Sequence, residues 1–356
     1  MARPRPTLAS NSKHATFLCQ AHAVTERLAR YEGVVGVLLV GGVARGHADR
    51  FSELDLAVYL RQADFARWTV EGAAPFPEGD SNIDGQHVDL EYCCYEEERE
   101  REWDLSKRWD RSYALLLYDP HDLMEGMLAQ KCRLTEAEKQ CLATKHLITY
   151  GDYFCRIAVP SWLYRGDVLA AHHCLNLALD SLVKAVFLAN DELVPFEKWA
   201  LNFSYSLAWR PPKWREKVEQ ALLVREVTQE EVERRRALLC DLFAQCKERL
   251  GLAGAEGLDA IEVRKLKMLR YVRERRTMPA KEFDERFGLR QAIQSPLFQV
   301  LGRETRSGEA WFVFDEARFA EYAQRDFSGF LDWDRQLLRQ LMQPGASRPT
   351  GMDAEP

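Results

Sequence analysis

The sequence lacks the long apolar segment that a membrane-spanning helix requires. None of its hydrophobic runs approaches the roughly 18 residues needed to cross a bilayer, and no secretion signal is recognisable. It has no excess of positive charge either. The formal net charge of −6 argues against broad, non-specific binding to nucleic acid. We therefore expect a soluble, cytoplasmic protein without a membrane partner.

Metal-binding cysteine motifs are also missing. The nine cysteines are scattered without CxxC or Cys/His spacing, and the adjacent Cys93 and Cys94 point to opposite faces of an expected strand. An odd number of cysteines without a secretion signal indicates reduced thiols. The composition, with 46% hydrophobic and 29% charged residues, is that of a globular protein long enough for two or three domains.

The most informative stretch lies between residues 34 and 60. An apolar segment of strand length covers Val34–Val40 and ends at Gly41 and Gly42. After a short helical connection we expect a second strand that carries Glu53 and Asp55. Because side chains alternate along a strand, the two carboxylates face the same way and repel each other unless a cation lies between them. Carboxylates and substrate phosphates commonly hold Mg²⁺, so the stretch predicts a metal and phosphate site.

A further pair of acids follows on a neighbouring strand. In the segment HVDLEYC the period of two places Asp89 and Glu91 on one face and apolar residues on the other. In one interpretation Asp89 is a metal ligand or a base, and Glu91 supports it or contacts an acceptor. In the other, both acids point to solvent from a half-exposed edge strand.

These motifs resemble the signature of the nucleotidyltransferase (polymerase β-like) superfamily. Its pattern has a Gly-Gly or Gly-Ser turn, a short connection and then alternating acidic and hydrophobic residues, which corresponds here to GGVARG and SELDL. The best match is to bacterial antibiotic-modifying members, the aminoglycoside nucleotidyltransferases with a C-terminal helical bundle. Two positions depart from the pattern: Gly42 replaces the more common serine, and Glu53 replaces the more common aspartate. The resemblance covers the first third of the chain.

The resemblance implies an enzyme that moves NMP from an NTP, with ATP the first candidate, to a hydroxyl of a small, aminoglycoside-like acceptor. Two Mg²⁺ ions would be held by the metal ligands Glu53, Asp55 and Asp89, and Glu91 would join them as a catalytic carboxylate. Further residues are expected to contact the nucleotide: Gly41, Gly42, Arg45, Ser52, Lys184 and Lys198. For Arg45 and the two lysines, an ordinary solvent-facing role is the alternative.

The fold class expected is α+β, with three parts and a tail. Residues 1–131 would form a mixed-sheet nucleotidyltransferase domain, and residues 132–251 a helical bundle that starts at a capping box, Thr135 to Glu138. Residues 256–343 would form a small C-terminal domain with winged-helix-like order of elements. The tail at residues 344–356 is rich in Pro, Gly and Ser and is expected to be disordered.

Two other functions remain open from sequence. One is a toxin-like or regulatory nucleotidyltransferase that modifies a protein or tRNA. The other is a non-catalytic nucleotide sensor whose C-terminal domain binds DNA, because an expected helix there carries seven Lys or Arg residues between Arg264 and Arg276. The same domain could instead serve for docking on the bundle or for pairing of subunits.

Overall fold

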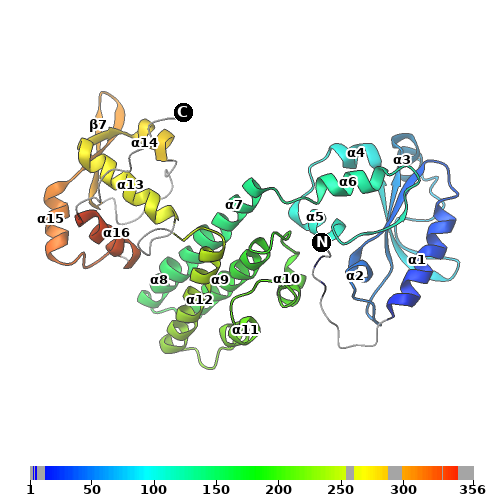
Figure 1. Ribbon diagram of the computed structural model, residues 1–356, viewed down its shortest axis with the longest axis horizontal. Helices are drawn as coiled ribbons and strands as arrows, with labels where there is room; N and C mark the ends of the chain where they lie inside the picture. Colours follow the sequence, from blue (N-terminus) through cyan, green and yellow to red (C-terminus); the bar gives the residue numbers. More distant parts are fainter. Residues whose placement is uncertain are drawn as a thin grey trace. The chain divides into compact units, whose positions relative to one another are not determined.

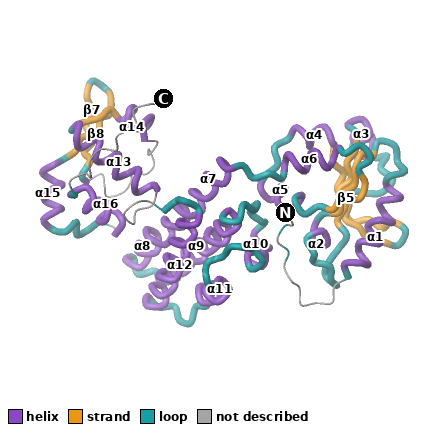
Figure 2. The backbone as a smooth tube through the Cα atoms, in the orientation of Figure 1, coloured by secondary structure: helices purple, strands orange, loops and turns teal. Residues whose placement is uncertain are grey.

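The structure, a computed structural model, describes residues 3, 5, 13–253, 260–287, 299–330 and 332–343 (Figures 1 and 2). The chain divides into two compact units, which are described separately. The first consists of residues 1–147 and 179–224, and the second of residues 148–178 and 225–356. The expected α+β class is confirmed. The three-part division drawn from composition stays a prediction.

The first unit begins with the elements of the N-terminal sheet domain. In chain order these are α1 (His14–Leu28), β1 (Val34–Leu39), α2 (Gly41–Ala44), β2 (Asp55–Leu60), α3 (Gln62–Thr69), β3 (Gly79–Ile83), β4 (Gln86–Cys94), α4 (Tyr95–Glu100), α5 (Leu105–Arg111), β5 (Leu115–Tyr118), α6 (Leu123–Lys131) and α7 (Glu136–Thr144). To these it adds the end of α9 (Val168–Leu188), α10 (Glu197–Ser204) and α11 (Trp214–Leu222).

The sheet of the first unit has five strands in the order β3-β4-β2-β1-β5. It is mixed, because β2 and β4 run parallel while the other pairs are antiparallel. Strand β1 is buried at all six positions, as its continuous apolar sequence predicts. It lies between β2 and β5, and the glycine turn at its end is therefore placed beside the start of β2.

Each face of the sheet is covered by its own hydrophobic cluster. Helices α1 and α3 pack on the face that carries Leu56, Val58 and Leu60 of β2. Helices α4 and α6 pack on the opposite face, which carries Ala57 and Tyr59. Because Asp55 has the same parity as these last two residues, it lies on the face covered by α4 and α6, at the start of the strand.

Strand β4 is positioned by a tight hairpin. Asp84 and Gly85 both have positive φ, 52° and 85°, as a type I′ turn between β3 and β4 requires. The period of two expected for this strand is observed: Val88 and Leu90 are buried and Asp89 is exposed. The hairpin thus brings Asp89 to the face of the sheet on which Asp55 lies.

Several local expectations need correction. Glu53 precedes β2 instead of lying on it, and β1 ends at Leu39, one residue earlier than predicted. The dense run of charges at residues 96–109 is not simply a solvated surface, because Trp103, between α4 and α5, and Trp109, in α5, are both buried. The capping box at Thr135 is confirmed.

The second unit contains the remaining helices and a small sheet. Its elements are most of η1 (Lys145–Ala158, a π-helix), α8 (Val159–Tyr164), the first half of α9, α12 (Gln229–Arg249), α13 (Ala260–Arg275), β6 (Thr277–Pro279), α14 (Ala280–Phe287), β7 (Leu301–Arg306), β8 (Glu309–Phe314), α15 (Glu316–Gln324) and α16 (Asp332–Met342). A buried ion pair, Lys247 to Asp152 at 2.6 Å, joins α12 to η1. None of the helices in the described ranges is long and apolar enough to cross a membrane.

The C-terminal module contains α13, β6, α14, the hairpin of β7 and β8, α15 and α16, with strands ordered β6-β8-β7. Its winged-helix assignment stays a prediction, because residues 288–298 lie outside the described residues. Part of the basic stripe on α13 is engaged within the module, and its role as a phosphate-binding surface stays a prediction. Arg273 pairs with Glu316 at 2.8 Å, Arg275 pairs with Glu282 at 3.1 Å, and Lys265 is buried, since one side of α13 packs into the module's core.

Candidate active site

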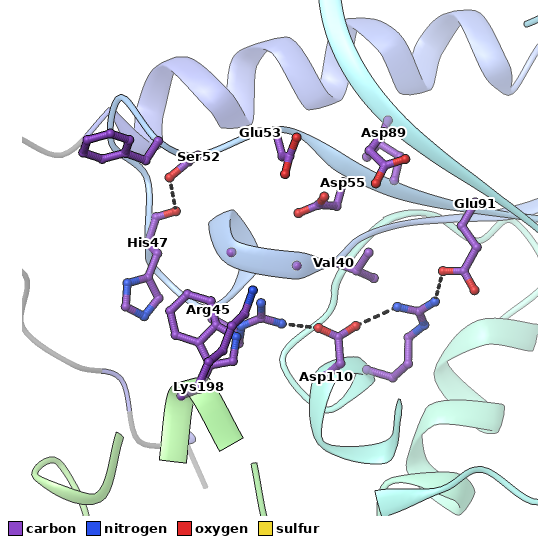
Figure 3. Close-up of a pocket in the computed structure, with 16 residues that line it drawn as sticks. Val40, Arg45, His47, Ser52, Glu53, Asp55, Asp89, Glu91, Asp110 and Lys198 are labelled. Carbon is purple, nitrogen blue, oxygen red and sulfur yellow. Dashed lines mark hydrogen bonds and ion pairs between the residues drawn. The ribbon is translucent and has the colours of Figure 1, made fainter. Parts of the chain in front are cut away.

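A cavity of about 410 Å³ opens in the first unit next to the glycine turn (Figure 3). The residues that line it are Val40, Gly41, Gly42, Arg45, His47, Phe51, Ser52, Glu53, Asp55, Leu56, Asp89, Glu91, Asp110, Arg111, Lys198 and Trp199. They come from the glycine turn and the loop after it, from β2 and β4, from the end of α5 and from the first turn of α10. Two parts of the chain far apart in sequence therefore build one pocket.

Three carboxylates share one wall of this pocket. Asp55 and Asp89 are direct partners in the parallel β2–β4 register, and the Asp89 N–H donates to the Leu54 carbonyl at 2.9 Å. Their side chains project from one face of neighbouring strands, and Glu53 reaches the same region from the residues before β2 (Figure 3). The two-residue spacing in the sequence predicts that Glu53 and Asp55 lie together. The register between β2 and β4 places Asp89 beside them.

The electrostatics of Asp55 reflect this crowding. Burial and the neighbouring charges of Glu53 and Asp89 raise the pKa of Asp55 from 3.8 to about 6. A hydrogen bond from the Gly42 backbone and the positive charge of Arg45 oppose the rise. A pKa raised in this way means that the ionised carboxylate lacks enough positive charge around it, and a bound cation supplies that charge.

Gly41 explains how the turn comes so near to Asp55. Its φ of +65° lies in the left-handed region, and a Cβ at this position would overlap the Asp55 carboxylate. Gly42 differs, because its φ is not positive and the nearest atom to a Cβ there is the His47 carbonyl oxygen at 3.6 Å, an ordinary contact. A side chain is thus excluded at Gly41, whereas the structure leaves room for one at Gly42.

The donor set of this wall fits Mg²⁺, a hard cation that prefers oxygen ligands. Within the described part of the chain, no three Asp, Glu, His or Cys side chains converge into a complete metal cage by themselves. Such a cage is not required, because Mg²⁺ usually takes one or two carboxylates and completes its coordination with water and substrate phosphates. Glu53, Asp55 and Asp89 therefore fit a metal that arrives with a nucleotide.

Glu91 lies on the same face two residues beyond Asp89, but its carboxylate is engaged. Burial would raise the pKa of Glu91, yet the guanidinium of Arg111 and the ammonium of Lys107 outweigh it and hold that pKa below its ordinary value. Arg111, itself buried, pairs with Glu91 through one nitrogen and with Asp110 through the other, at 2.7 Å for the second pair. Glu91 is therefore an ionised, charge-paired residue of the pocket wall.

Arg45 ends this chain of ion pairs. Its guanidinium pairs with Asp110 and lies over two indole rings, at 5.0 Å from the centroid of Trp109 and 5.1 Å from that of Trp199. Such a position, buried between aromatic faces, fixes the guanidinium strongly. Arg45 thus lines the pocket as a fixed charge that joins α2 to α5 and α10, and the solvent-facing alternative does not hold.

The two lysines proposed from sequence lie in different surroundings. Lys198, in the first turn of α10, lines the pocket beside Arg45 and rests over the Trp199 ring at 5.1 Å. Lys184 does not line it, and pairs with Asp180 at 2.9 Å and with Glu197 at 3.2 Å. Ser52 lines the pocket, but its hydroxyl donates to the His47 carbonyl at 2.9 Å and holds the loop in place.

Several lining residues are not predicted from sequence. Asp110 and Arg111 lie in a dense run of charges that gives no sign of which members are buried. His47 stacks against Trp199 with ring centroids 4.6 Å apart, and burial together with the charge of Arg45 lowers the pKa of His47. For Trp199, its place directly after the predicted Lys198 is the sequence signal that could have found it.

A substitution of Arg111 tests the ion-pair chain. Arg111→Met removes the buried guanidinium that Glu91 and Asp110 share, and we expect a loss of about 1–2 kcal/mol in the free energy of unfolding. The loss is smaller than for a fully buried pair, because the Glu91 side chain is 46% exposed and keeps Lys107 at 3.8 Å. The double variant Arg111→Met/Glu91→Gln should recover part of that stability, since the carboxylate charge that Arg111 no longer balances is gone. Urea unfolding of the three proteins measures the effect. Equal stability of the single and double variants would contradict it.

Comparisons with known proteins assign the domain that holds most of this pocket. The family described as nucleotidyltransferase domain matches residues 22–115. The chain is also similar to a solved structure, a nucleotidyltransferase-like protein from Exiguobacterium sibiricum 255-15, at 14% sequence identity and a TM-score of 0.40. The match covers 84% of this chain and 99% of that chain. None of the curated proteins matches.

The matched residues include the glycine turn, the three carboxylates and the pair Asp110 and Arg111. They form a nucleotidyltransferase domain, so the superfamily expected from the sequence is confirmed. This domain supports a nucleotidyltransferase enzyme, one that transfers NMP in general.

Proposed function

We propose that the protein is a Mg²⁺-dependent enzyme that transfers NMP, from ATP in the first instance, to a hydroxyl of a small molecule. The observation that carries this proposal is the meeting of three carboxylates with a glycine whose missing side chain leaves the backbone next to Asp55. The acidic wall would hold Mg²⁺ through Glu53, Asp55 and Asp89. Bound there, the ion would neutralise phosphate charge and make the acceptor hydroxyl more acidic.

The chain's own residues orient the reactants. Lys198 contacts the phosphates of the NTP and stabilises the charge that builds on the departing pyrophosphate. The acceptor oxygen forms a bond to the α-phosphorus while the bond from that phosphorus to the bridging oxygen breaks, and pyrophosphate leaves. The hydroxyl proton passes to Asp89. Arg45 and Arg111, fixed by ion pairs, keep the wall around Glu91 rigid.

The acceptors first to be tested are the aminoglycoside-like compounds implied by the sequence resemblance. One observation also favours the alternative acceptors, protein or tRNA. Glu91 and Asp110, the two lining acids beyond the three assigned to metal, are already paired with Arg111 and Arg45. They are therefore not free to bind the ammonium groups of a polycation.

Release of pyrophosphate from each NTP, measured with Mg²⁺ and a panel of acceptors, tests the proposed function. Glu26→Gln, which removes an exposed carboxylate on α1 away from the pocket, serves as the charge-matched control for substitutions of the acidic wall. Acceptor-dependent release that requires both Mg²⁺ and Asp55 is the expected result. Nucleotide binding without turnover on any acceptor would instead indicate a sensor.

Lys198→Gln should raise the KM for the NTP about tenfold, the scale of one lost charge-assisted contact to phosphate. The effect on kcat should be smaller, since Lys198 lines the pocket rim and is exposed. Lys184→Gln is the matched control on the preceding helix, and its KM should stay within about twofold of the native value because Lys184 is engaged with Asp180 and Glu197. Steady-state kinetics of both variants decide between the two lysines.

A further inference from the structure

A separate cavity of about 490 Å³ lies in the first unit at the far end of α10. It is formed by the end of that helix, the loop that follows and the first turn of α11. Its lining residues are Tyr205, Ala208, Arg210, Pro211, Pro212, Lys213, Trp214, Arg215 and Glu216. None of them lines the active-site pocket.

The loop that shapes this cavity is rigidly held. The Asn190 side chain, at the end of α9, binds both backbone groups of Trp209: its amide nitrogen donates to the Trp209 carbonyl at 2.9 Å, and its oxygen accepts from the Trp209 N–H at 2.7 Å. At the other end, the buried Trp214 indole N–H donates to the Ser204 hydroxyl at 2.9 Å. Two consecutive prolines restrict the backbone between these anchors. The loop is therefore pre-organised for a ligand.

The cavity is positively charged. Arg210, Lys213 and Arg215 are all exposed at its walls, against the single carboxylate of Glu216. Arg215 is paired with Glu219 at 3.2 Å. For Arg210 and Lys213, the described residues provide no carboxylate within ion-pair distance, although Arg210 donates to the Tyr205 carbonyl. Two cations on a fixed loop, without acidic partners, favour an anion, and the planar fork of an arginine matches phosphate well.

The position of the cavity connects it to the active site. Lys198, at the rim of the active-site pocket, and Tyr205, on the wall of this cavity, are seven residues apart on α10 and its helical cap residue. Because seven residues make nearly two full turns, both side chains project from one face of the helix, about 10 Å apart along its axis. A molecule that reaches from Lys198 to Tyr205 must span at least that length along α10.

We propose that this cavity binds a phosphate group of the acceptor, so that the enzyme modifies a phosphate-bearing molecule. The inference rests on the proposed function, since it places the acceptor hydroxyl in the active-site pocket. It agrees with the prior pairing of Glu91 and Asp110, which leaves those acids unsuited to a polycation. The phosphate can belong to a small phosphorylated compound or to the end of an RNA strand.

Calorimetric titration without NTP or metal tests the cavity directly. The small-molecule arm compares ribose 5-phosphate with ribose, which differ only in the phosphate, and the nucleic-acid arm uses a five-nucleotide RNA. We expect ribose 5-phosphate, the RNA or both to bind, and the variant Arg210→Gln/Lys213→Gln to bind at least about tenfold more weakly. Arg30→Gln, an exposed arginine on the sheet domain, should bind like the native protein.

Turnover separates failure of this inference from failure of the proposed function. With a phosphorylated acceptor, the double variant should show an acceptor KM raised about tenfold and an unchanged KM for the NTP. Equal binding by the native protein and the double variant, or binding of neither phosphate probe, overturns the inference. So does efficient transfer to an aminoglycoside that the double variant retains. Absence of pyrophosphate release on every acceptor refutes the proposed function alone, because the binding comparison does not depend on turnover.

Discussion

Asp55→Asn is expected to abolish NMP transfer while it raises the melting temperature of the metal-free protein. The loss of kcat should reach ~10³-fold or more, the scale seen when one member of a catalytic unit is removed. The metal-free variant should nevertheless be more stable than the native protein. In the native protein, burial and the charges of Glu53 and Asp89 make the ionised Asp55 unfavourable and raise its pKa to about 6. Removing roughly 1 kcal/mol of repulsion shifts the Tm of a unit of this size by about 2–4 °C.

The pH dependence of this gain follows from the direction of the shift. The pKa of Asp55 is higher in the folded chain than the ordinary value of 3.8, so ionisation in the folded state costs free energy. The cost is absent below pH 3.8, grows as the pH rises toward 6 and then levels off. The difference in Tm between Asp55→Asn and the native protein should grow in the same way.

Scanning calorimetry at a series of pH values, with and without Mg²⁺, measures both effects. Added Mg²⁺ together with an NTP should stabilise the native protein and leave Asp55→Asn unchanged, because a ligand stabilises only a folded state that binds it. Glu26→Gln provides the control for loss of one exposed charge. A variant that melted below the native protein at pH 7.5 without metal would contradict the proposed repulsion.

Gly41→Ala is expected to eliminate activity through geometry alone. The position has φ +65°, which costs an alanine about 1 kcal/mol or more, and the new methyl group would overlap the Asp55 carboxylate. The carboxylate must move or the turn must open, and either change displaces a proposed metal ligand. We expect kcat/KM to fall at least ~10²-fold, measured as pyrophosphate release.

Gly42→Ser is the matched variant at the next position. A Cβ there has its nearest neighbour, the His47 carbonyl oxygen, at 3.6 Å, so the fold should accept the serine that the family pattern more often has. We expect unchanged stability within about 0.5 kcal/mol and a lower KM for the NTP, since a hydroxyl becomes available to the phosphates. An equal loss of kcat/KM in Gly41→Ala and Gly42→Ser would contradict the prediction that only Gly41 must lack a side chain.

The sequence predicted those parts of the site that depend on local periodicity. Alternation along β4 placed Asp89 with Glu91, and the hairpin turn at Asp84-Gly85 has the residues its backbone requires. The same argument grouped Glu53 with Asp55, and both line the pocket, although Glu53 precedes β2. Which strands become neighbours is not a local property. Sequence therefore gave no physical reason why Asp89 should be the register partner of Asp55, and only the family resemblance suggested it.

The ion-pair chain lay beyond prediction for a different reason. Between residues 96 and 111, buried and exposed charges alternate without a regular period, because α4 and α5 are too short to show one. Arg111 is buried by tertiary contacts with β4, and Trp199 contacts Arg45 from a helix about 150 residues further along the chain. Neither contact can be predicted from the residues that are its neighbours in the sequence.

The stacking of Arg45 between Trp109 and Trp199 decides whether the nucleotidyltransferase domain can form its pocket on its own. The residues that match the nucleotidyltransferase family end at 115, yet one face of this guanidinium is supplied by α10, more than 80 positions further on. Lys198 comes from that helix as well. A shortened chain that stopped at residue 131 would keep every carboxylate and lose one wall of the pocket. The part of the chain that is needed to form the complete pocket is therefore longer than the domain that matches the family.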